Sequence, residues 1–184
     1  MNVLESFSLK GKVALVTGGA GLYGRQIVEA LAEAGAETYI ASRNLDSLQQ
    51  VAKEEVERGH NVTAMKLDLS EDESIENLHH DIIDKSGKCD ILINNAVSRE
   101  FGSAGWKNTL DDFDKSLRVN ASALFKITEM FAEDMKKNSS GSIINIGSMM
   151  GTVGVENGNY EGTDFTPATS PLYFYEKGGM HNFT

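Results

Sequence analysis

Residues 12–25 read KVALVTGGAGLYGR, and this stretch decides the fold. It starts with the pattern of a buried strand, passes through closely spaced glycines and enters a run with helical periodicity at residues 25–35. A glycine-rich turn between a strand and a helix lets the backbone approach a pyrophosphate, which lies at the positive end of the helix dipole. Such glycines can also occur only because the turn needs a positive φ angle. The consecutive order of strand, turn and helix favours the other explanation, which is dinucleotide binding. The candidate cofactor contacts here are Gly18, Gly21, Leu22, Tyr23 and Gly24.

The alternation of short β-branched runs with longer helical runs continues along the chain. The predicted strands are 12–18, 37–42, 61–69, 90–96 and 141–148, and the predicted helices are 25–35, 45–59, 70–85 and 109–137. Ser70 followed by Glu73 is a capping-box pattern that opens the third helix. Strands alternating with helices predict an α/β fold with a doubly wound parallel sheet, the Rossmann fold. No repeat or linker interrupts the pattern, so residues 1–184 are predicted to form a single dinucleotide-binding and catalytic domain.

Composition narrows the classes of function. Of the 184 residues, 40% are hydrophobic and 24% charged, with a formal net charge of −10. That charge argues against nucleic acid as a partner, because phosphate neutralisation needs clustered Lys and Arg. Cys89 is the only cysteine, so no internal disulfide can form, and neither a signal peptide nor a membrane span is visible. We expect a cytoplasmic protein with a small-molecule substrate, no membrane partner and no metal.

The end of the second predicted strand bears on the choice of cofactor. NAD-preferring dehydrogenases usually place an acidic residue there to bind the ribose 2′-hydroxyl. Here IASRN (40–44) offers Ser42 and then Arg43, and an arginine can bind a 2′-phosphate through two hydrogen bonds. The sequence therefore favours NADP(H), with NAD(H) as the alternative, and adds Ser42 and Arg43 to the candidate cofactor contacts.

Further motifs give the chain a family likeness. They are KLDLS (66–70), NNAV (94–97), RVNASALF (118–125), GSIINIGSMMG (141–151), PLYFYEKGGM (171–180) and KGGMHNFT (177–184). With the glycine turn, they make essentially the whole chain resemble the short-chain dehydrogenase/reductase family. This resemblance implies that Asp68 binds the adenine amino group and that Leu69, Asn95 and Ala96 join the cofactor contacts.

The resemblance also implies the catalytic residues Asn120, Ser148, Tyr173 and Lys177. A spacing of four places Tyr173 and Lys177 on one helical face, so Lys177 can support Tyr173 and reach the cofactor ribose. A tyrosine hydroxyl is a weak base at neutral pH, and a nearby ammonium favours its ionised form. Tyr173 would be the general acid in reduction and the general base in oxidation. Ser148 would orient the substrate oxygen, and Asn120 would hold a water that links Lys177 to solvent.

Two other tyrosines compete for the catalytic position. Tyr175 lies about 200° around the helix from Lys177, so it faces elsewhere. Tyr160 has the usual family spacing from Ser148, but the residue four positions later is Asp164. Tyr173 alone is followed by a lysine four positions later, behind a helix start at Ser170-Pro171. The loop 151–170 is therefore read as an insertion that lies beside the substrate pocket.

Two departures from the family pattern leave alternatives open. Leu22 stands where the compact branch of the family has glycine, and TGGAGLYG also fits the extended, nucleotide-sugar branch. Val97 replaces the last glycine of the NNAG motif. The intact NNA, the long fifth-strand motif and the helix after Lys177 favour the compact branch. Within it, the C-terminal motifs are similar to those of oxidoreductases near sugar and flagellin-glycan biosynthesis.

Together these features predict an oxidoreductase that transfers a hydride between NADP(H) or NAD(H) and a secondary alcohol or ketone, with sugar derivatives among the candidates. The alternatives are a nucleotide-sugar epimerase or dehydratase of the extended branch, and a non-catalytic dinucleotide sensor. Family members continue beyond the helix that contains Lys177, so we expect residues 1–184 to be part of a longer protein, without its C-terminal strands. The family likeness also implies a homodimer or homotetramer.

Overall fold

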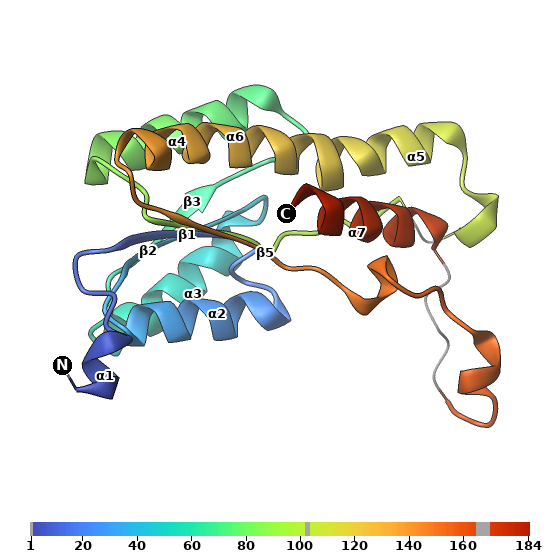
Figure 1. Ribbon diagram of the computed structural model, residues 1–184, viewed down its shortest axis with the longest axis horizontal. Helices are drawn as coiled ribbons and strands as arrows, with labels where there is room; N and C mark the ends of the chain where they lie inside the picture. Colours follow the sequence, from blue (N-terminus) through green and yellow to red (C-terminus); the bar gives the residue numbers. More distant parts are fainter. Residues whose placement is uncertain (1, 102–103, 165–169) are drawn as a thin grey trace.

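Five parallel strands form the central sheet of the computed structural model, in which residues 2–101, 104–164 and 170–184 are described (Figure 1). The strands are β1 (Val13–Thr17), β2 (Glu37–Ser42), β3 (Val62–Lys66), β4 (Ile91–Asn94) and β5 (Ser142–Asn145). Their order across the sheet is β3-β2-β1-β4-β5, and each neighbouring pair is parallel. The strand order reverses between β1 and β4, which is where open α/β sheets bind their ligands.

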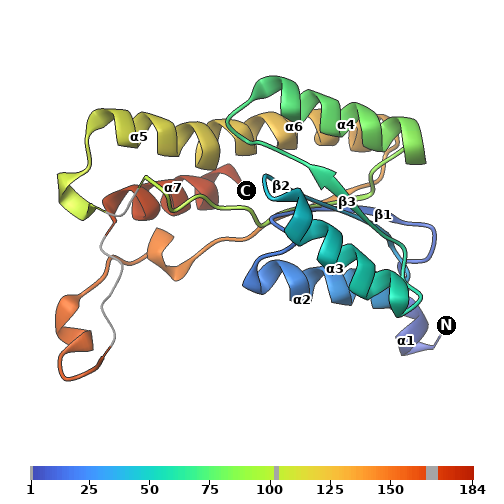
Figure 2. The same ribbon diagram turned by 180° about the vertical axis from the view of Figure 1, so that it is seen from behind.

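Helices cover both faces of this sheet, as Figures 1 and 2 show from opposite sides. One face carries α2 (Leu22–Glu33) and α3 (Leu45–Glu57), and the other carries α4 (Asp72–Ser86) and α6 (Ala123–Lys137). The remaining helices are α1 (Val3–Ser6), α5 (Leu110–Leu117) and α7 (Pro171–Phe183). The predicted doubly wound parallel sheet is therefore confirmed. No helix in the described part of the chain is long and apolar enough to span a membrane.

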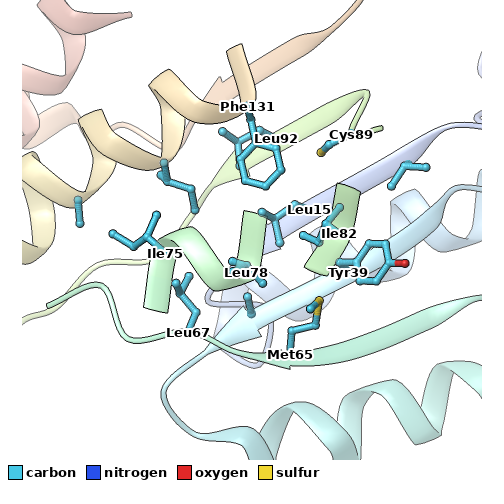
Figure 3. Packing of buried hydrophobic residues seen from close by; sticks show 14 of the residues in the cluster. Leu15, Tyr39, Met65, Leu67, Ile75, Leu78, Ile82, Cys89, Leu92 and Phe131 are labelled. Carbon is cyan, nitrogen blue, oxygen red and sulfur yellow. The ribbon is translucent and has the colours of Figure 1, made fainter. Parts of the chain in front are cut away.

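The sheet separates two hydrophobic clusters because successive side chains of a strand point to opposite faces. Leu15 of β1 packs with Ile75 and Phe131 on the side of α4 and α6 (Figure 3). Its neighbour Val16 belongs to the second cluster, together with Val28 of α2. All of β1 is buried, which is the expected property of a central parallel strand.

Four predicted strands end earlier in the structure than in the sequence pattern, and one of them is β5, which stops at Asn145. β1 stops at Thr17, β3 at Lys66 and β4 at Asn94, because the following residues leave the sheet to form the loops of the candidate site. The predicted capping box was wrong. α4 begins after Glu71, and the hydroxyl of Ser70 donates to Asp68 at 2.7 Å instead of capping the helix.

The C-terminal helix α7 begins as the sequence predicts, with Ser170 at the N-cap position and Pro171 in the first turn. The hydroxyl of Ser170 makes no capping hydrogen bond. A Cβ atom on Gly151 would lie 2.6 Å from the Lys177 carbonyl oxygen, so the short turn Met149–Gly151 packs directly on α7. The turn Asn157–Tyr160 projects away from the sheet, and residues 165–169 of the predicted insertion lie outside the described residues (Figure 1).

Candidate active site

The glycine turn between β1 and α2 has the close packing that the sequence suggests. Gly18 has a φ angle of +69°, a conformation that residues with a side chain rarely adopt. A Cβ on Gly24 would lie 2.2 Å from the Gly18 carbonyl oxygen, and one on Gly19 would lie 2.8 Å from Ile40. Gly21 precedes α2 and has no side chain to cap the N–H groups of its first turn. These N–H groups can therefore serve an anionic ligand, and the turn fits a dinucleotide phosphate.

A cavity of about 620 Å³ opens at this turn and runs along the carboxyl ends of β1, β2, β3 and β4. It brings together eleven of the residues predicted as cofactor contacts. These are Gly18, Gly21, Leu22, Tyr23, Gly24, Ser42, Arg43, Asp68, Leu69, Asn95 and Ala96. Its volume lies within the usual range for cofactor sites. Leu22 and Tyr23 are largely exposed at its mouth, so Leu22 is compatible with an open path for the phosphate.

Charged groups surround the end of the cavity near β2. Arg43 forms an exposed ion pair with Glu100, with 3.2 Å between guanidinium and carboxylate. The ammonium of Lys66 donates to the backbone carbonyl of Arg43, which places a second cation beside it. Hydrogen bonds from the hydroxyl and the backbone N–H of Ser70 hold the pKa of Asp68 below its usual range, against the effect of burial. Asp68 is thus a carboxylate acceptor, and the two cations lie where β2 and β3 end.

The loop after β4 is fixed to β1 by short polar contacts. The Thr17 hydroxyl accepts the backbone N–H groups of Asn95 at 3.1 Å and of Ala96 at 3.0 Å. The Asn95 side chain donates to the carbonyls of Thr17 at 3.0 Å and Gly18 at 3.1 Å. The NNA motif therefore joins the two central strands at the glycine turn and shapes the floor of the cavity.

Asn120 occupies the π-helical turn Arg118–Ser122 between α5 and α6. Its amide oxygen accepts the Ser98 N–H at 2.8 Å, and its amide nitrogen donates to the Ser98 carbonyl at 2.9 Å. The same nitrogen donates to the buried carboxylate of Glu176 at 2.9 Å. Asn120 thus connects the loop after β4 with α7. The π turn interrupts the regular α-helical hydrogen bonding at Asn120, whose side chain is buried.

Lys177 and Glu176 are adjacent ionisable residues of α7, and both are buried. The Lys177 ammonium donates to the Ile146 carbonyl at 2.6 Å and lies 5.9 Å from the centre of the Tyr173 ring. Burial lowers the pKa of Lys177, and the charge of Arg99 lowers it further, while Glu176 raises it. Burial raises the pKa of Glu176, whose carboxylate also accepts a 2.5 Å hydrogen bond from the Ser116 hydroxyl. The buried ammonium of Lys177 therefore lies next to the Tyr173 ring.

Asn120 reaches α7 through its hydrogen bond to Glu176, and Ser148 reaches α7 through the turn Met149–Gly151. Ser148 lies just after β5, and its hydroxyl accepts the Met150 N–H at 3.2 Å, which caps the turn that packs on α7. Tyr175 is 64% exposed and contacts Phe113, so the structure agrees that it faces away from Lys177. Tyr173 and Lys177 are not among the residues that line the 620 Å³ cavity. Arg99 lines it and lies 5.5 Å from the centre of the Tyr173 ring, so Arg99 connects the two parts of the site.

Sequence reasoning missed several residues at this site, chiefly Ser98, Arg99, Ser116 and Glu176. A charged residue that follows a strand-end motif or precedes the candidate lysine is a detectable signal. Arg99 follows NNAV after one serine, and Glu176 directly precedes Lys177. Their contacts, however, join residues far apart in the chain. Within the described residues, no group of three or more His, Cys, Asp or Glu side chains could hold a metal ion.

Comparison with known proteins adds independent findings. A model of the short chain dehydrogenase family matches residues 12–162. A short chain dehydrogenase/reductase of Colletotrichum higginsianum is 36% identical over 153 residues, which cover 82% of this chain and 57% of that protein. The chain therefore spans little more than half the length of this relative.

Two solved structures are similar over the whole chain. One is a gluconate 5-dehydrogenase from Burkholderia cenocepacia in complex with NADP and tartrate, with a TM-score of 0.82, 27% identity and coverage of 100% of this chain and 67% of that one. The other is a 7α-hydroxysteroid dehydrogenase with NADH and 7-oxo glycochenodeoxycholic acid, with a TM-score of 0.85, 26% identity and coverage of 100% and 66%. By its sequence match and by its fold, the chain belongs to the short-chain dehydrogenase family.

Proposed function

We propose that this protein is an oxidoreductase that uses NADP(H) in preference to NAD(H) and interconverts a secondary alcohol and a ketone, with sugar derivatives among its substrates. The observation that carries the proposal is the buried Lys177 ammonium beside the Tyr173 ring. The membership of the chain in the short-chain dehydrogenase family supports it, since the relatives of known activity include dehydrogenases that act on hydroxyl groups.

The residues of the cavity fit a nicotinamide dinucleotide. The glycine turn and the first turn of α2 would hold the phosphates, and Asp68 would accept a hydrogen bond from the adenine amino group. When bound, the cofactor supplies the hydride chemistry that the side chains of this protein lack. Arg43, with Lys66 beside it, would bind the 2′-phosphate of NADP(H). The carboxylate of Glu100 would have to leave Arg43 for this contact to form.

In the proposed mechanism Tyr173 moves the proton. Its hydroxyl donates to the substrate oxygen in reduction and accepts from the substrate hydroxyl in oxidation. The Lys177 ammonium, held by the Ile146 carbonyl, stabilises the ionised form of Tyr173. Ser148 would hydrogen-bond the substrate oxygen and orient it, once its hydroxyl turns from the Met150 N–H. Asn120 would hold the water that links Lys177 to solvent.

Full-length protein allows a direct test. Purified protein would be screened with secondary alcohols, ketones and sugar derivatives, with each cofactor in turn, while absorbance of the reduced nicotinamide is followed. We expect cofactor-dependent turnover with a higher kcat/KM for NADP(H). Cofactor binding without turnover of any carbonyl or alcohol would favour a dinucleotide sensor instead.

The proposal includes the cytoplasm as the location and a homodimer or homotetramer as the assembly. Phe125 of α6 is 55% exposed, and among the described aromatic rings it contacts only Phe183. Exposed aromatic side chains of this kind support association between copies of the chain. Light scattering of the full-length protein would measure the assembly, and a monomer at micromolar concentration would contradict it.

A further inference from the structure

The arginines of this chain differ in whether a carboxylate forms an ion pair with them. The chain has five arginines and 27 acidic residues. Arg25 pairs with Glu54 at 2.8 Å, and Arg58 with Glu29 at 2.8 Å. Arg118 pairs with Asp72 at 2.7 Å, and Arg43 with Glu100 at 3.2 Å. Arg99 alone has no carboxylate partner among the residues that the structure describes.

The position of this unpaired arginine is specific. Arg99 is exposed, lines the cavity predicted to hold the cofactor, and lies over the ring of Tyr173. Its neighbour Glu100 turns to Arg43, so the adjacent acid does not neutralise it. The preceding residue, Ser98, is fixed through both its N–H and its carbonyl to Asn120. The backbone that presents Arg99 is therefore held by a residue of the candidate site.

We propose that Arg99 binds an anionic oxygen group of the substrate, a carboxylate or a phosphate, and that the protein acts on hydroxy or keto acids or on their phosphorylated equivalents. This inference rests on the proposed function, since it names the substrate class for the same site. A guanidinium binds either group through two parallel hydrogen bonds. The same contact fixes the distance and orientation of the reacting carbon relative to Tyr173, which lies directly under the guanidinium.

The net negative charge of the chain opposes the approach of an anionic substrate. A net charge of −10 repels anions at long range, and a local cation in the cavity offsets that repulsion where the substrate binds. Near Tyr173 the described cations are Arg99 and the buried Lys177, and Glu176 on the opposite side of Lys177 is engaged by Ser116 and Asn120. Arg99 is the exposed member of this group, and so it is the one that a substrate can reach.

The ligands of the two similar structures are consistent with this chemistry. Tartrate and 7-oxo glycochenodeoxycholic acid both contain carboxyl groups and otherwise differ greatly in size and shape. They do not identify the substrate of this protein. In each of those two structures the acid is bound together with a nicotinamide cofactor.

A matched series of four-carbon ligands tests the inference. Erythronate, erythritol 4-phosphate and erythritol share a polyol chain and differ in carrying a carboxylate, a phosphate or no charge. Their dissociation constants would be measured by calorimetry on NADP-loaded full-length protein and on the variant Arg99→Gln. We expect the wild-type protein to bind at least one anion about tenfold or more tightly than erythritol, which is the strength of a charged bidentate pair. Arg99→Gln should lose this difference and leave the affinity for NADP within twofold.

Two further variants serve as controls for the effect of Arg99→Gln on anion binding. Arg58→Gln removes one positive charge far from the cavity, on the surface between α2 and α3, and should leave anion binding unchanged. Arg99→Lys keeps the positive charge but cannot form two parallel hydrogen bonds to one anion. It should therefore show only part of the preference for anions over erythritol. Preference for the carboxylate over the phosphate, or the reverse, would identify which anion the site selects.

The outcomes separate this inference from the proposed function. Equal binding of all three ligands by the wild-type protein, or the same anion preference in Arg99→Gln, would overturn the role of Arg99 while NADP binding and turnover stayed intact. Failure of the proposed function would appear instead as no NADP binding, or as no turnover of any carbonyl by the wild-type protein. An effect of Arg99→Gln on NADP affinity alone would assign Arg99 to the cofactor and contradict the inference.

Discussion

The two halves of the candidate site are built by different means. The half that would hold the cofactor consists mainly of backbone and short side chains at the ends of β1, β2 and β4, as at Gly18, Thr17 and Asn95. The half proposed to be catalytic depends on long side chains of one helix, Tyr173 and Lys177, and on the buried Glu176 next to Lys177 in the chain. The geometry of the cofactor half therefore depends on the conformation of the backbone. The geometry of the other half depends on the positions of a few side-chain atoms.

This difference has a physical cause. Backbone N–H groups and glycines carry no charge, so the cofactor half folds without burying an ion. In the catalytic half an ammonium and a carboxyl group are both buried, and each costs free energy unless it is hydrogen-bonded. The Ile146 carbonyl serves Lys177, while Ser116 and Asn120 serve Glu176. Mutations should therefore act through shape in the first half and through charge and hydrogen bonds in the second.

The largest effect on cofactor binding is expected from Gly24→Ala, in the cofactor half. The new Cβ would lie 2.2 Å from the Gly18 carbonyl oxygen, a backbone atom that cannot move without opening the glycine turn. We expect NADP affinity to fall by about a hundredfold or more, measured by calorimetry on full-length protein.

Gly154→Ala is the matched control, since a Cβ there meets no atom within 4 Å. It should leave NADP affinity unchanged. If Gly24→Ala bound NADP as well as this control does, the cofactor half would not depend on backbone shape, and the contrast between the two halves would fail.

The next effect concerns Arg43, the charged residue of the cofactor half. Arg43→Asp should reduce kcat/KM for NADP about tenfold or more relative to NAD, because a carboxylate repels the 2′-phosphate. Glu100→Gln should act in the opposite direction and improve NADP binding by a few-fold, since it frees Arg43. Steady-state kinetics with both cofactors would measure the ratio. An unchanged ratio in Arg43→Asp would remove Arg43 from the cofactor site.

In the catalytic half, Glu176→Leu should destabilise the fold. The variant leaves the buried donors of Ser116 and Asn120 without their acceptor, which costs about 1–3 kcal/mol for a buried unsatisfied group. Glu176→Gln keeps an acceptor for Asn120 and should cost less. Urea unfolding of the three proteins would measure the difference. Equal stability of the leucine variant and the wild type would show that this network contributes nothing to the fold.

The smallest expected effect is a dependence of stability on pH. Burial raises the pKa of Glu176 in the folded protein above its unfolded value. The contribution of Glu176 to stability is therefore fully present below the unfolded pKa and is lost as pH rises through the folded pKa. As pH rises from below the unfolded carboxyl pKa to neutral pH, the Tm of the wild type should fall relative to that of Glu176→Gln by a few degrees. A constant difference across this range would mean that Glu176 does not titrate there.

The same contrast explains what the sequence could predict. The glycine turn and β1 were predictable because strand, turn and helix are consecutive, and all eleven proposed cofactor contacts outside α7 line one cavity. The contact between Ser116 and Glu176 joins residues 60 positions apart, and no local pattern indicates it. The capping box at Ser70 failed for a local reason, because the Ser70 hydroxyl donates to Asp68 two positions earlier. Local patterns therefore predict the half built from backbone, and contacts distant in sequence determine the half built from side chains.

The central claim is that Tyr173 transfers the proton in a site whose cofactor half binds independently of it. The most direct measurement compares Tyr173→Phe with Tyr175→Phe and wild type in the full-length protein, for turnover and for NADP affinity. Tyr173→Phe should lower kcat by about a thousandfold, within the range for loss of a general acid or base, and leave the NADP dissociation constant within twofold. Tyr175→Phe should match the wild type, because Tyr175 is exposed and faces Phe113. Wild-type turnover by Tyr173→Phe would contradict the account.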